Sequence, residues 1–207
     1  MGRRSTHTPD QLRDLILDAA QSIIENSGLA GLSAREIARM IEYSPGTIYN
    51  MFANLDDVIV HVEGRVLDSL GAKLAGIARS QGKDAPLRLA NAYLASAHEK
   101  PRLWNLLFEH HLPNDAKLPA WYKEKLDNLV TLFDAALGQC VTQADAARRL
   151  SAHSLWAGVH GITSLSTTGK LSSISRETAE SLVGNLVGTY LAGLAAIQVA
   201  PPPPGAN

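Results

Sequence analysis

The chain has 207 residues and a formal net charge of −1, from 19 lysines and arginines against 20 aspartates and glutamates. This balance excludes a protein that binds nucleic acid through overall positive charge, so any such binding must depend on a local surface. The single cysteine, Cys140, excludes an intrachain disulfide and thiolate metal sites within one subunit. We expect Cys140 to be a buried structural thiol, the alternative being a redox sensor.

The N-terminal residues do not resemble a signal peptide. The charged N-terminal residues are not followed by an apolar segment of the signal-peptide kind. We expect no apolar run to approach the roughly 20 residues that a membrane-spanning helix needs. The sequence therefore predicts a cytoplasmic protein that does not span a membrane.

An amphipathic helix is expected from Asp10 to Ser27. Its apolar side chains recur at helical spacing, and Gly28 provides the stop signal directly after the last periodic residue. The apolar positions are Leu12, Leu15, Ile16, Ala19 and Ile23. We expect this helix to support the two short helices that follow it.

A helix-turn-helix is expected between Leu32 and Phe52. Ser33 followed three residues later by Glu36 is a capping box, in which each residue's side chain satisfies the other's backbone N–H. Leu32 and Ile37 flank this box at the spacing of a hydrophobic staple. The first short helix should therefore begin at Ser33.

The second short helix should begin at Ser44, which acts as its cap. Pro45 fits the first turn because its missing N–H has no intrahelical partner there, and Gly46 leaves room for a phosphate backbone. Ile48 and Phe52 are four residues apart and should point inward together.

The other side of this second helix predicts a DNA-contacting surface. Thr47 and Tyr49 are expected to contact phosphates, and Asn50 to reach a base edge. Two arginines on the N-terminal arm can enter the minor groove or lie along phosphates, the alternative being an exposed tail without a role on DNA. The predicted DNA-binding residues are Arg3, Arg4, Ser33, Arg35, Ser44, Pro45, Gly46, Thr47, Tyr49 and Asn50.

The order of residues in this first quarter of the chain resembles the tetracycline-repressor (TetR) family. The family pattern has a helix with a double alanine, a glycine turn, Ser/Thr-x-x-x-Ile-Ala, and Ser-x-Gly-Thr-x-Tyr-x-x-Phe. The matching residues are Ala19, Ala20, Gly28, Ser33, Ile37, Ala38, Ser44, Gly46, Thr47, Tyr49 and Phe52. The resemblance implies an all-α fold with a three-helix helix-turn-helix DNA-binding module in residues 1–54. A helical ligand-binding and dimerisation bundle would occupy residues 55–199, and a disordered tail residues 200–207.

The chain departs from the family pattern at two positions. Leu55 stands where many members carry lysine, and Met51 where histidine often precedes the closing phenylalanine. Two candidate phosphate contacts are therefore missing. We therefore expect DNA binding to depend on few cations. Each lost phosphate contact lowers the slope of log affinity against log salt by about one unit.

Helices are expected to continue to the end of the chain, with no strand pattern between them. Asn54 should cap a fourth helix that runs to about Ala78 and links the DNA-binding module to the body, transmitting effector binding as the resemblance implies. Later helices are expected near Pro86 to Glu99, Pro101 to His111, Pro119 to Val141, Gln143 to Thr168 and Ser175 to Val199.

Two stripes of small residues on the last two long helices predict a subunit contact. The segment from Leu155 to Leu165 also resembles the Trp-His-Gly type of regulatory domain found in part of the family, in which the last two helices form a four-helix bundle between two copies. Small side chains let helices approach closely. The stripes are Ala157, Gly161 and Ser164, and Gly184, Gly188, Ala192 and Ala195. The alternative is that they pack only within one subunit.

The effector site is predicted from aromatic and imidazole side chains on the middle and late helices. In the family these helices enclose a pocket, and apolar walls with a few polar groups suit a small organic ligand. The predicted residues are Trp104, Phe108, His111, Trp121, Trp156 and His160. The alternative is that these side chains only fill the core.

Metal and enzymatic functions find little support in the sequence. His153 and His160 lie about 10.5 Å apart along a helix axis, and neighbours such as His110 and His111 point about 100° apart, so neither pair suits one zinc ion. No phosphate loop, dinucleotide glycine set or nucleophile motif occurs. We therefore expect no metal, cofactor or catalysis.

The sequence predicts a homodimeric transcriptional regulator, a repressor released from a double-stranded DNA operator by a small hydrophobic effector. The alternative is a helical ligand-binding or enzymatic protein whose DNA-binding module has weakened, for which the scarcity of lysine is the supporting feature.

Overall fold

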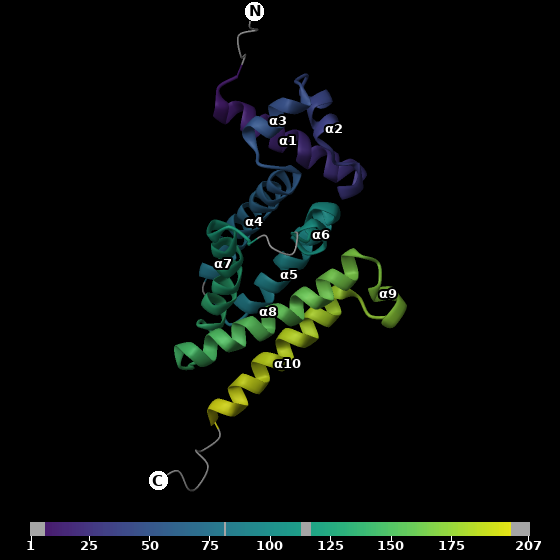
Figure 1. Ribbon diagram of the computed structural model, residues 1–207. Helices are drawn as coiled ribbons and strands as arrows, with labels where there is room; N and C mark the ends of the chain where they lie inside the picture. Colours follow the sequence, from purple (N-terminus) through teal and green to yellow (C-terminus); the bar gives the residue numbers. More distant parts are fainter. Residues whose placement is uncertain (1–6, 81, 113–116, 200–207) are drawn as a thin grey trace, which may run out of the picture. The chain divides into compact units, whose positions relative to one another are not determined.

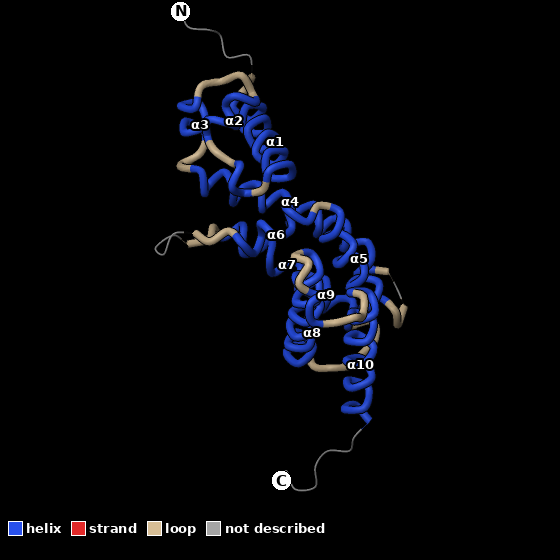
Figure 2. The backbone as a smooth tube through the Cα atoms, turned by 90° about the vertical axis from the view of Figure 1, so that its right-hand side faces the viewer, coloured by secondary structure: helices blue, strands red, loops and turns tan. Residues whose placement is uncertain are grey.

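The computed structural model describes residues 7–80, 82–112 and 117–199, and all regular elements in these residues are helical, as predicted (Figure 1, Figure 2). The described helices fall into two compact units: Met1–Asp68 with Lys100–Tyr122, and Ser69–Glu99 with Lys123–Asn207. We call them unit 1 and unit 2. The domain boundary expected at residue 54 stays a prediction. Arg3, Arg4 and the tail 200–207 lie outside the described residues.

Unit 1 begins with helix α1 (Pro9–Ser27). Thr8 caps it in a reciprocal box: its hydroxyl accepts from the Gln11 N–H at 3.3 Å, and the Gln11 side chain accepts from the Thr8 N–H at 2.9 Å. The helix therefore starts one residue before the predicted Asp10. Gly28 ends it with φ 72°, a conformation that favours glycine.

The helix-turn-helix follows α1. A single 3₁₀ turn, η1 (Leu29–Gly31), leads into α2 (Ala34–Met40), and a tight turn leads from there into α3 (Pro45–Met51). Both helices start directly after the serines that the sequence marked as caps. α3 is only seven residues long, too short to be stable by itself, so its position depends on packing.

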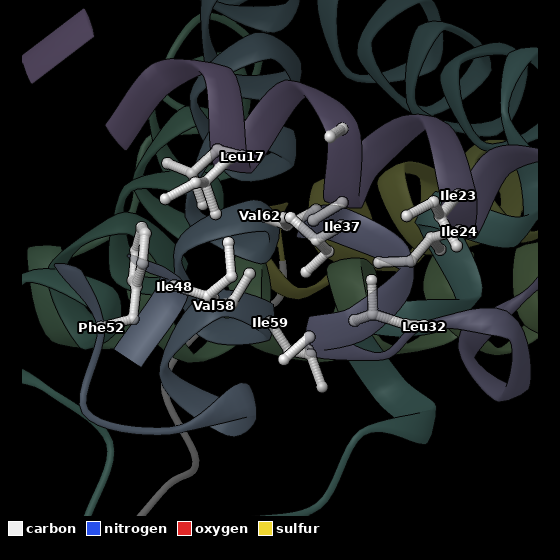
Figure 3. Packing of buried hydrophobic residues seen from close by; sticks show 14 of the residues in the cluster. Leu17, Ile23, Ile24, Leu32, Ile37, Ile48, Phe52, Val58, Ile59 and Val62 are labelled. Atoms are coloured by element: carbon white, nitrogen blue, oxygen red, sulfur yellow. The ribbon is translucent and has the colours of Figure 1, made fainter. Parts of the chain in front are cut away.

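One apolar cluster holds the helices of unit 1 together (Figure 3). Ile16 of α1, Ile37 of α2 and Ile48 of α3 are completely buried in it. Leu103 and Leu106 of α6 (Pro101–Glu109) complete the cluster from a distant part of the sequence. Full burial of one such side chain stabilises a fold by about 1.5–3 kcal/mol.

Helix α4 (Leu55–Arg79) begins in unit 1 and ends in unit 2. As predicted, Asn54 caps it, accepting from the Asp57 N–H at 2.8 Å. The Asp57 carboxylate accepts from the Ala53 N–H at 2.9 Å, so the turn before the helix is fixed from both sides. This turn joins α4 directly to the end of α3.

Unit 2 contains α5 (Ala85–Glu99), most of α7 (Ala120–Leu137), α8 (Asp145–Thr167), α9 (Leu171–Ile174) and α10 (Ala179–Val199). Helices α8 and α10 pack against each other and both pack on α5 (Figure 1). The short α9 was not predicted. α7 ends four residues before the predicted Val141, and α10 starts four residues after the predicted Ser175.

Helix α10 corrects the expectation that no segment approaches membrane-spanning length. Residues 179–197 have a mean hydropathy of 1.2 and are long and apolar enough to cross a membrane, yet only 17% of that window is buried. One such helix is weak evidence for a membrane.

Candidate DNA-binding site

The start of α2 is fixed by Ser33, whose hydroxyl accepts from the Glu36 N–H at 3.1 Å. The second half of the predicted capping box is absent, because the Glu36 carboxylate accepts hydrogen bonds from Arg39 at 2.9 Å and 2.5 Å instead. That ion pair uses one of the few cations of this region. Arg35 is exposed and forms no ion pair within the described part of the chain.

The start of α3 differs from a simple serine cap. Ser44 occupies the cap position but its hydroxyl makes no bond to the helix backbone; it bonds the Thr47 hydroxyl at 3.1 Å instead. Pro45 and Gly46 are exposed in the first turn, and a Cβ on Gly46 would meet only the Ser44 hydroxyl oxygen, at 3.8 Å. The first turn of α3 therefore presents an open surface beside two paired hydroxyls.

The two sides of α3 differ sharply in exposure. Ile48 is 0% exposed, and Phe52, directly after the helix, is 2% exposed. On the opposite side Tyr49 is 55% exposed and Asn50 is exposed, while Thr47 is partly buried. The inward positions of Ile48 and Phe52 and the exposed positions of Tyr49 and Asn50 agree with the sequence prediction, whereas Thr47 is less exposed than predicted.

An arginine of α1 holds the end of α3, a contact that the sequence did not indicate. Arg13 Nη1 donates to the Met51 carbonyl at 3.1 Å, and the guanidinium carbon lies 4.3 Å from the centre of the Phe52 ring. Arg13 Nη2 lies 2.6 Å from His61 Nε2 on α4. The same His61 nitrogen lies 3.5 Å from an Asp57 carboxylate oxygen. Arg13 is thus directed into unit 1 rather than toward a DNA surface.

A second polar cluster in unit 1 also escaped the sequence analysis. Glu63 of α4 is 2% exposed, and its carboxylate accepts from His110 Nδ1 at 3.1 Å, while His110 Nε2 lies 3.4 Å from Asp56. Burial raises the pKa of Glu63, and hydrogen bonds from Tyr122 and His110 oppose that rise. The available signal was Glu63 itself, which lies four residues from both Ile59 and Leu67 on the apolar side of α4.

Four of the predicted effector residues belong to unit 1. Trp104 is 3% exposed and packs on the Phe108 ring at a centroid distance of 5.8 Å. Trp121 stacks on the His61 ring at 5.0 Å. His111 is exposed just after α6, and its Nδ1 donates to the Glu109 carbonyl at 2.8 Å. A ligand role for these residues stays a prediction.

The other two predicted effector residues belong to unit 2. Trp156 and His160 stack along α8 at a centroid distance of 5.5 Å. His160 Nδ1 lies 3.2 Å from the hydroxyl of Tyr93, whose ring meets Phe133 edge-on. Burial lowers the pKa of His160 and raises that of the Tyr93 hydroxyl. These rings form one aromatic group that contains the Tyr93 hydroxyl, His160 Nδ1 and the buried Trp156 Nε1.

The predicted subunit-contact glycines have open space beside them. A Cβ on Gly161, Gly184 or Gly188 would meet nothing within 4 Å, and Gly188 and Ala192 are exposed. Ala157 is exposed and Ser164 is partly buried. Gly161, Gly184 and Gly188 therefore do not serve to bring these two helices together within the subunit.

The lone Cys140 lies three residues after the end of α7 and is half-buried, not fully buried as expected. Its Sγ lies 3.3 Å from the Lys83 carbonyl, and burial raises the pKa of its thiol, which disfavours the reactive thiolate. Among the described residues, no three His, Cys, Asp or Glu side chains are grouped so that they could hold a metal ion.

The fold and this site together define a helical protein with an N-terminal helix-turn-helix. Residues 16–62 match the family of bacterial regulatory proteins called the tetR family, and residues 87–189 match a tetracyclin repressor-like C-terminal domain. The chain belongs to the tetracycline-repressor (TetR) family, as the resemblance predicted. The Trp-His-Gly type of its C-terminal part stays a prediction.

A curated relative agrees with this membership. The HTH-type transcriptional regulator YobS of Bacillus subtilis (strain 168) is 30% identical over 88 residues, which is 42% of this chain and 46% of YobS. The match therefore spans about half the length of that relative.

Solved structures share the fold at low identity. A protein of unknown function from Rhodococcus sp. RHA1 has a TM-score of 0.74 at 22% identity, covering 94% of this chain and 100% of its own. The regulator FadR from Bacillus subtilis, solved in complex with stearoyl-CoA, has a TM-score of 0.63 at 16% identity, covering 87% of this chain and 98% of its own.

Proposed function

We propose that this protein is a cytoplasmic, homodimeric transcriptional repressor that binds a DNA operator through α3 and is released by a small hydrophobic effector. One observation carries the proposal: Ile48 and Phe52 fix one side of α3 in the core, while Tyr49 and Asn50 remain exposed on the other. A helix-turn-helix uses such a rigidly supported polar side to read the major groove.

The residues of α3 divide between positioning and specificity. Thr47 and Tyr49 carry hydroxyl groups that donate to phosphate oxygens, which orient a protein on the duplex without reading its sequence. The side-chain amide of Asn50 has both a donor and an acceptor. It can therefore bond the N7 acceptor and the N6 amino donor that adenine presents in the major groove. Exposed Arg35 on α2 adds a charge for the phosphate backbone.

The proposed dimer is supported by α10. Only 17% of its window of high hydropathy is buried in one subunit, and Ile197 on this helix is 69% exposed. Contiguous exposed apolar surface marks interaction sites, and the open glycine positions on α8 and α10 permit a close partner. A two-fold dimer would present two copies of α3 to half-sites about one DNA turn apart.

The proposed effector is apolar, in keeping with the aromatic residues that both units contain. FadR from Bacillus subtilis, which shares the fold, was solved with stearoyl-CoA, so a long-chain acyl thioester is the first effector to test. An effector releases the operator only to the extent that it binds the DNA-incompetent state more tightly.

The competing reading, a helical ligand-binding or enzymatic protein with a weakened DNA-binding module, is favoured by the scarcity of available cations. Arg13 is turned inward and Arg39 is paired with Glu36. The membership in a family of regulators weighs against an enzyme.

Selection from a random library of DNA duplexes separates the two readings. We expect the protein to enrich one common sequence, with an affinity that falls as salt rises and that stearoyl-CoA reduces. Absence of any enriched sequence together with tight binding of the thioester would support the competing reading.

A further inference from the structure

We propose that Arg13 is a positioning residue for the recognition helix α3, and that protonation of His61 releases it, so that operator binding weakens at mildly acidic pH. This inference rests on the proposed function, because α3 is taken to be the helix that enters the DNA groove. All the residues involved belong to unit 1.

Arg13 acts on the C-terminal end of α3. Its Nη1 donates to the carbonyl of Met51, the last residue of the helix, at 3.1 Å, and its guanidinium lies over the Phe52 ring. The last carbonyls of a helix lack backbone hydrogen-bond donors and carry a partial negative charge. A guanidinium at this end supplies a donor and also neutralises part of that charge. Met51 is within one helical turn of Tyr49 and Asn50, so this contact acts close to the proposed DNA-contacting side chains.

The position of Arg13 depends on the protonation state of His61. Arginine can only donate hydrogen bonds, so His61 Nε2, at 2.6 Å from Arg13 Nη2, must be the acceptor. The imidazole is therefore neutral, with its proton on Nδ1. A second proton would occupy Nε2, remove the acceptor and place two positive charges in contact.

Asp57 offers the protonated ring another partner. One of its carboxylate oxygens lies 3.5 Å from the same Nε2 that accepts from Arg13. Neutral His61 pairs with Arg13, whereas charged His61 pairs with Asp57. Two alternative partners for one nitrogen give the network two discrete arrangements.

The groups around His61 set the pH at which its ring takes up a second proton. The charged groups that act on it are Arg13 of α1 and Asp57 and Arg65 of α4, and the uncharged rings of Phe52 and Trp121 pack against it. Burial and the charge of Arg13 lower the pKa of His61 below 6.5, and Asp57 opposes them. The Arg13 contact is therefore complete at neutral pH and is lost as the pH falls through this lowered pKa.

The first test measures DNA affinity against pH. The probe is the duplex that the wild-type protein enriches from a random library at pH 7.5, followed by fluorescence anisotropy between pH 5 and 8. We expect wild-type affinity to fall about tenfold per pH unit for each subunit that contacts the duplex, below the pKa of His61. His61→Gln, which keeps an uncharged acceptor, should bind as wild type at pH 7.5 and lose this dependence. His153→Gln, on exposed His153 of α8, is the matched control and should keep the wild-type profile.

Two arginine variants separate positioning from general stability. Arg13→Gln should weaken binding at pH 7.5 and flatten the pH profile, and Arg13→Lys should restore part of the affinity because it returns one donor. Equal melting temperatures would show that the fold is intact. A His61→Gln protein that keeps the wild-type pH profile would overturn the proposal.

The second test needs no DNA. Titration of the His61 ring by NMR should give a higher pKa in Arg13→Gln than in the wild type, because a neighbouring positive charge is removed. An unchanged pKa would overturn the proposed contact even if DNA binding is normal. If no duplex is enriched, the proposed function fails, while the NMR result still decides whether Arg13 and His61 are coupled.

Discussion

Leu186 of α10 lies directly over Gly158 of α8, with its Cδ2 only 2.7 Å from where a Cβ on Gly158 would stand. The two helices approach closely at this point within one subunit. A Cβ on Gly161, Gly184 or Gly188 would instead meet nothing within 4 Å. Glycine thus has an internal packing role at residue 158, which the small-residue stripes of the sequence analysis did not include.

This contrast gives a paired prediction for Gly158 and Gly188. Gly158→Leu should lower the free energy of unfolding by about 1 to 3 kcal/mol, because it overpacks the α8 and α10 contact. Gly188→Leu should leave the packing of a single subunit intact but separate the dimer and reduce DNA affinity. Analytical ultracentrifugation and urea denaturation distinguish these effects. If Gly188→Leu remains a dimer at nanomolar concentration with native operator affinity, the subunit contact lies elsewhere.

Tyr49→Ala should weaken binding to every duplex about tenfold or more, because the hydroxyl is proposed to contact phosphate rather than a base. Stability should change by less than about 0.5 kcal/mol, since Tyr49 is 55% exposed. Met40→Ala, at a residue of α2 that is 47% exposed, is the control and should bind normally. Native affinity in both Tyr49→Ala and Thr47→Ala, with unchanged melting curves, would show that the DNA-binding residues are misassigned.

The sequence predicted those features that arise from residues close together in the chain. Ser33 and Asn54 mark helix starts through bonds to residues three positions away, and such signals can be read from a short segment. The burial of Ile48 follows from helical periodicity in the same way. No rule based on neighbouring residues predicts the polar network of Arg13 and His61. Arg13 and His61 are 48 residues apart in sequence, and only the assembled unit brings them together.

Local signals also failed where a side chain had two possible partners. Glu36 has the spacing to complete a capping box with Ser33 and equally to pair with Arg39, and the ion pair forms. Ser44 likewise bonds Thr47 instead of the backbone. The four-residue α9 is too short to show a periodicity. Sequence spacing identifies the possible partners, but competition between them is decided by the geometry of the folded chain.

Removal of residues 1–6 should lower operator affinity and reduce the slope of log affinity against log salt. Each phosphate contact supplied by Arg3 or Arg4 adds about one unit to that slope. The truncation leaves Thr8 and its cap on α1 in place, so the melting temperature should not change. A variant in which only these two arginines become serine should reproduce the effect. An unchanged salt slope would exclude a role for the arm on DNA.

Glu63→Gln should change how stability depends on pH. Burial raises the pKa of Glu63 above 4.5, so the folded protein holds this proton more tightly than the unfolded chain does. The resulting stabilisation is complete below pH 4.5 and is lost as the pH rises through the raised pKa. Glutamine at this position cannot titrate but can still accept a hydrogen bond from His110 or Tyr122. Urea denaturation between pH 4 and 7 should therefore show the wild type losing stability relative to Glu63→Gln as pH rises. Glu109→Gln, at an exposed residue of α6, should follow the wild type, and a pH-independent difference between wild type and Glu63→Gln would contradict the raised pKa.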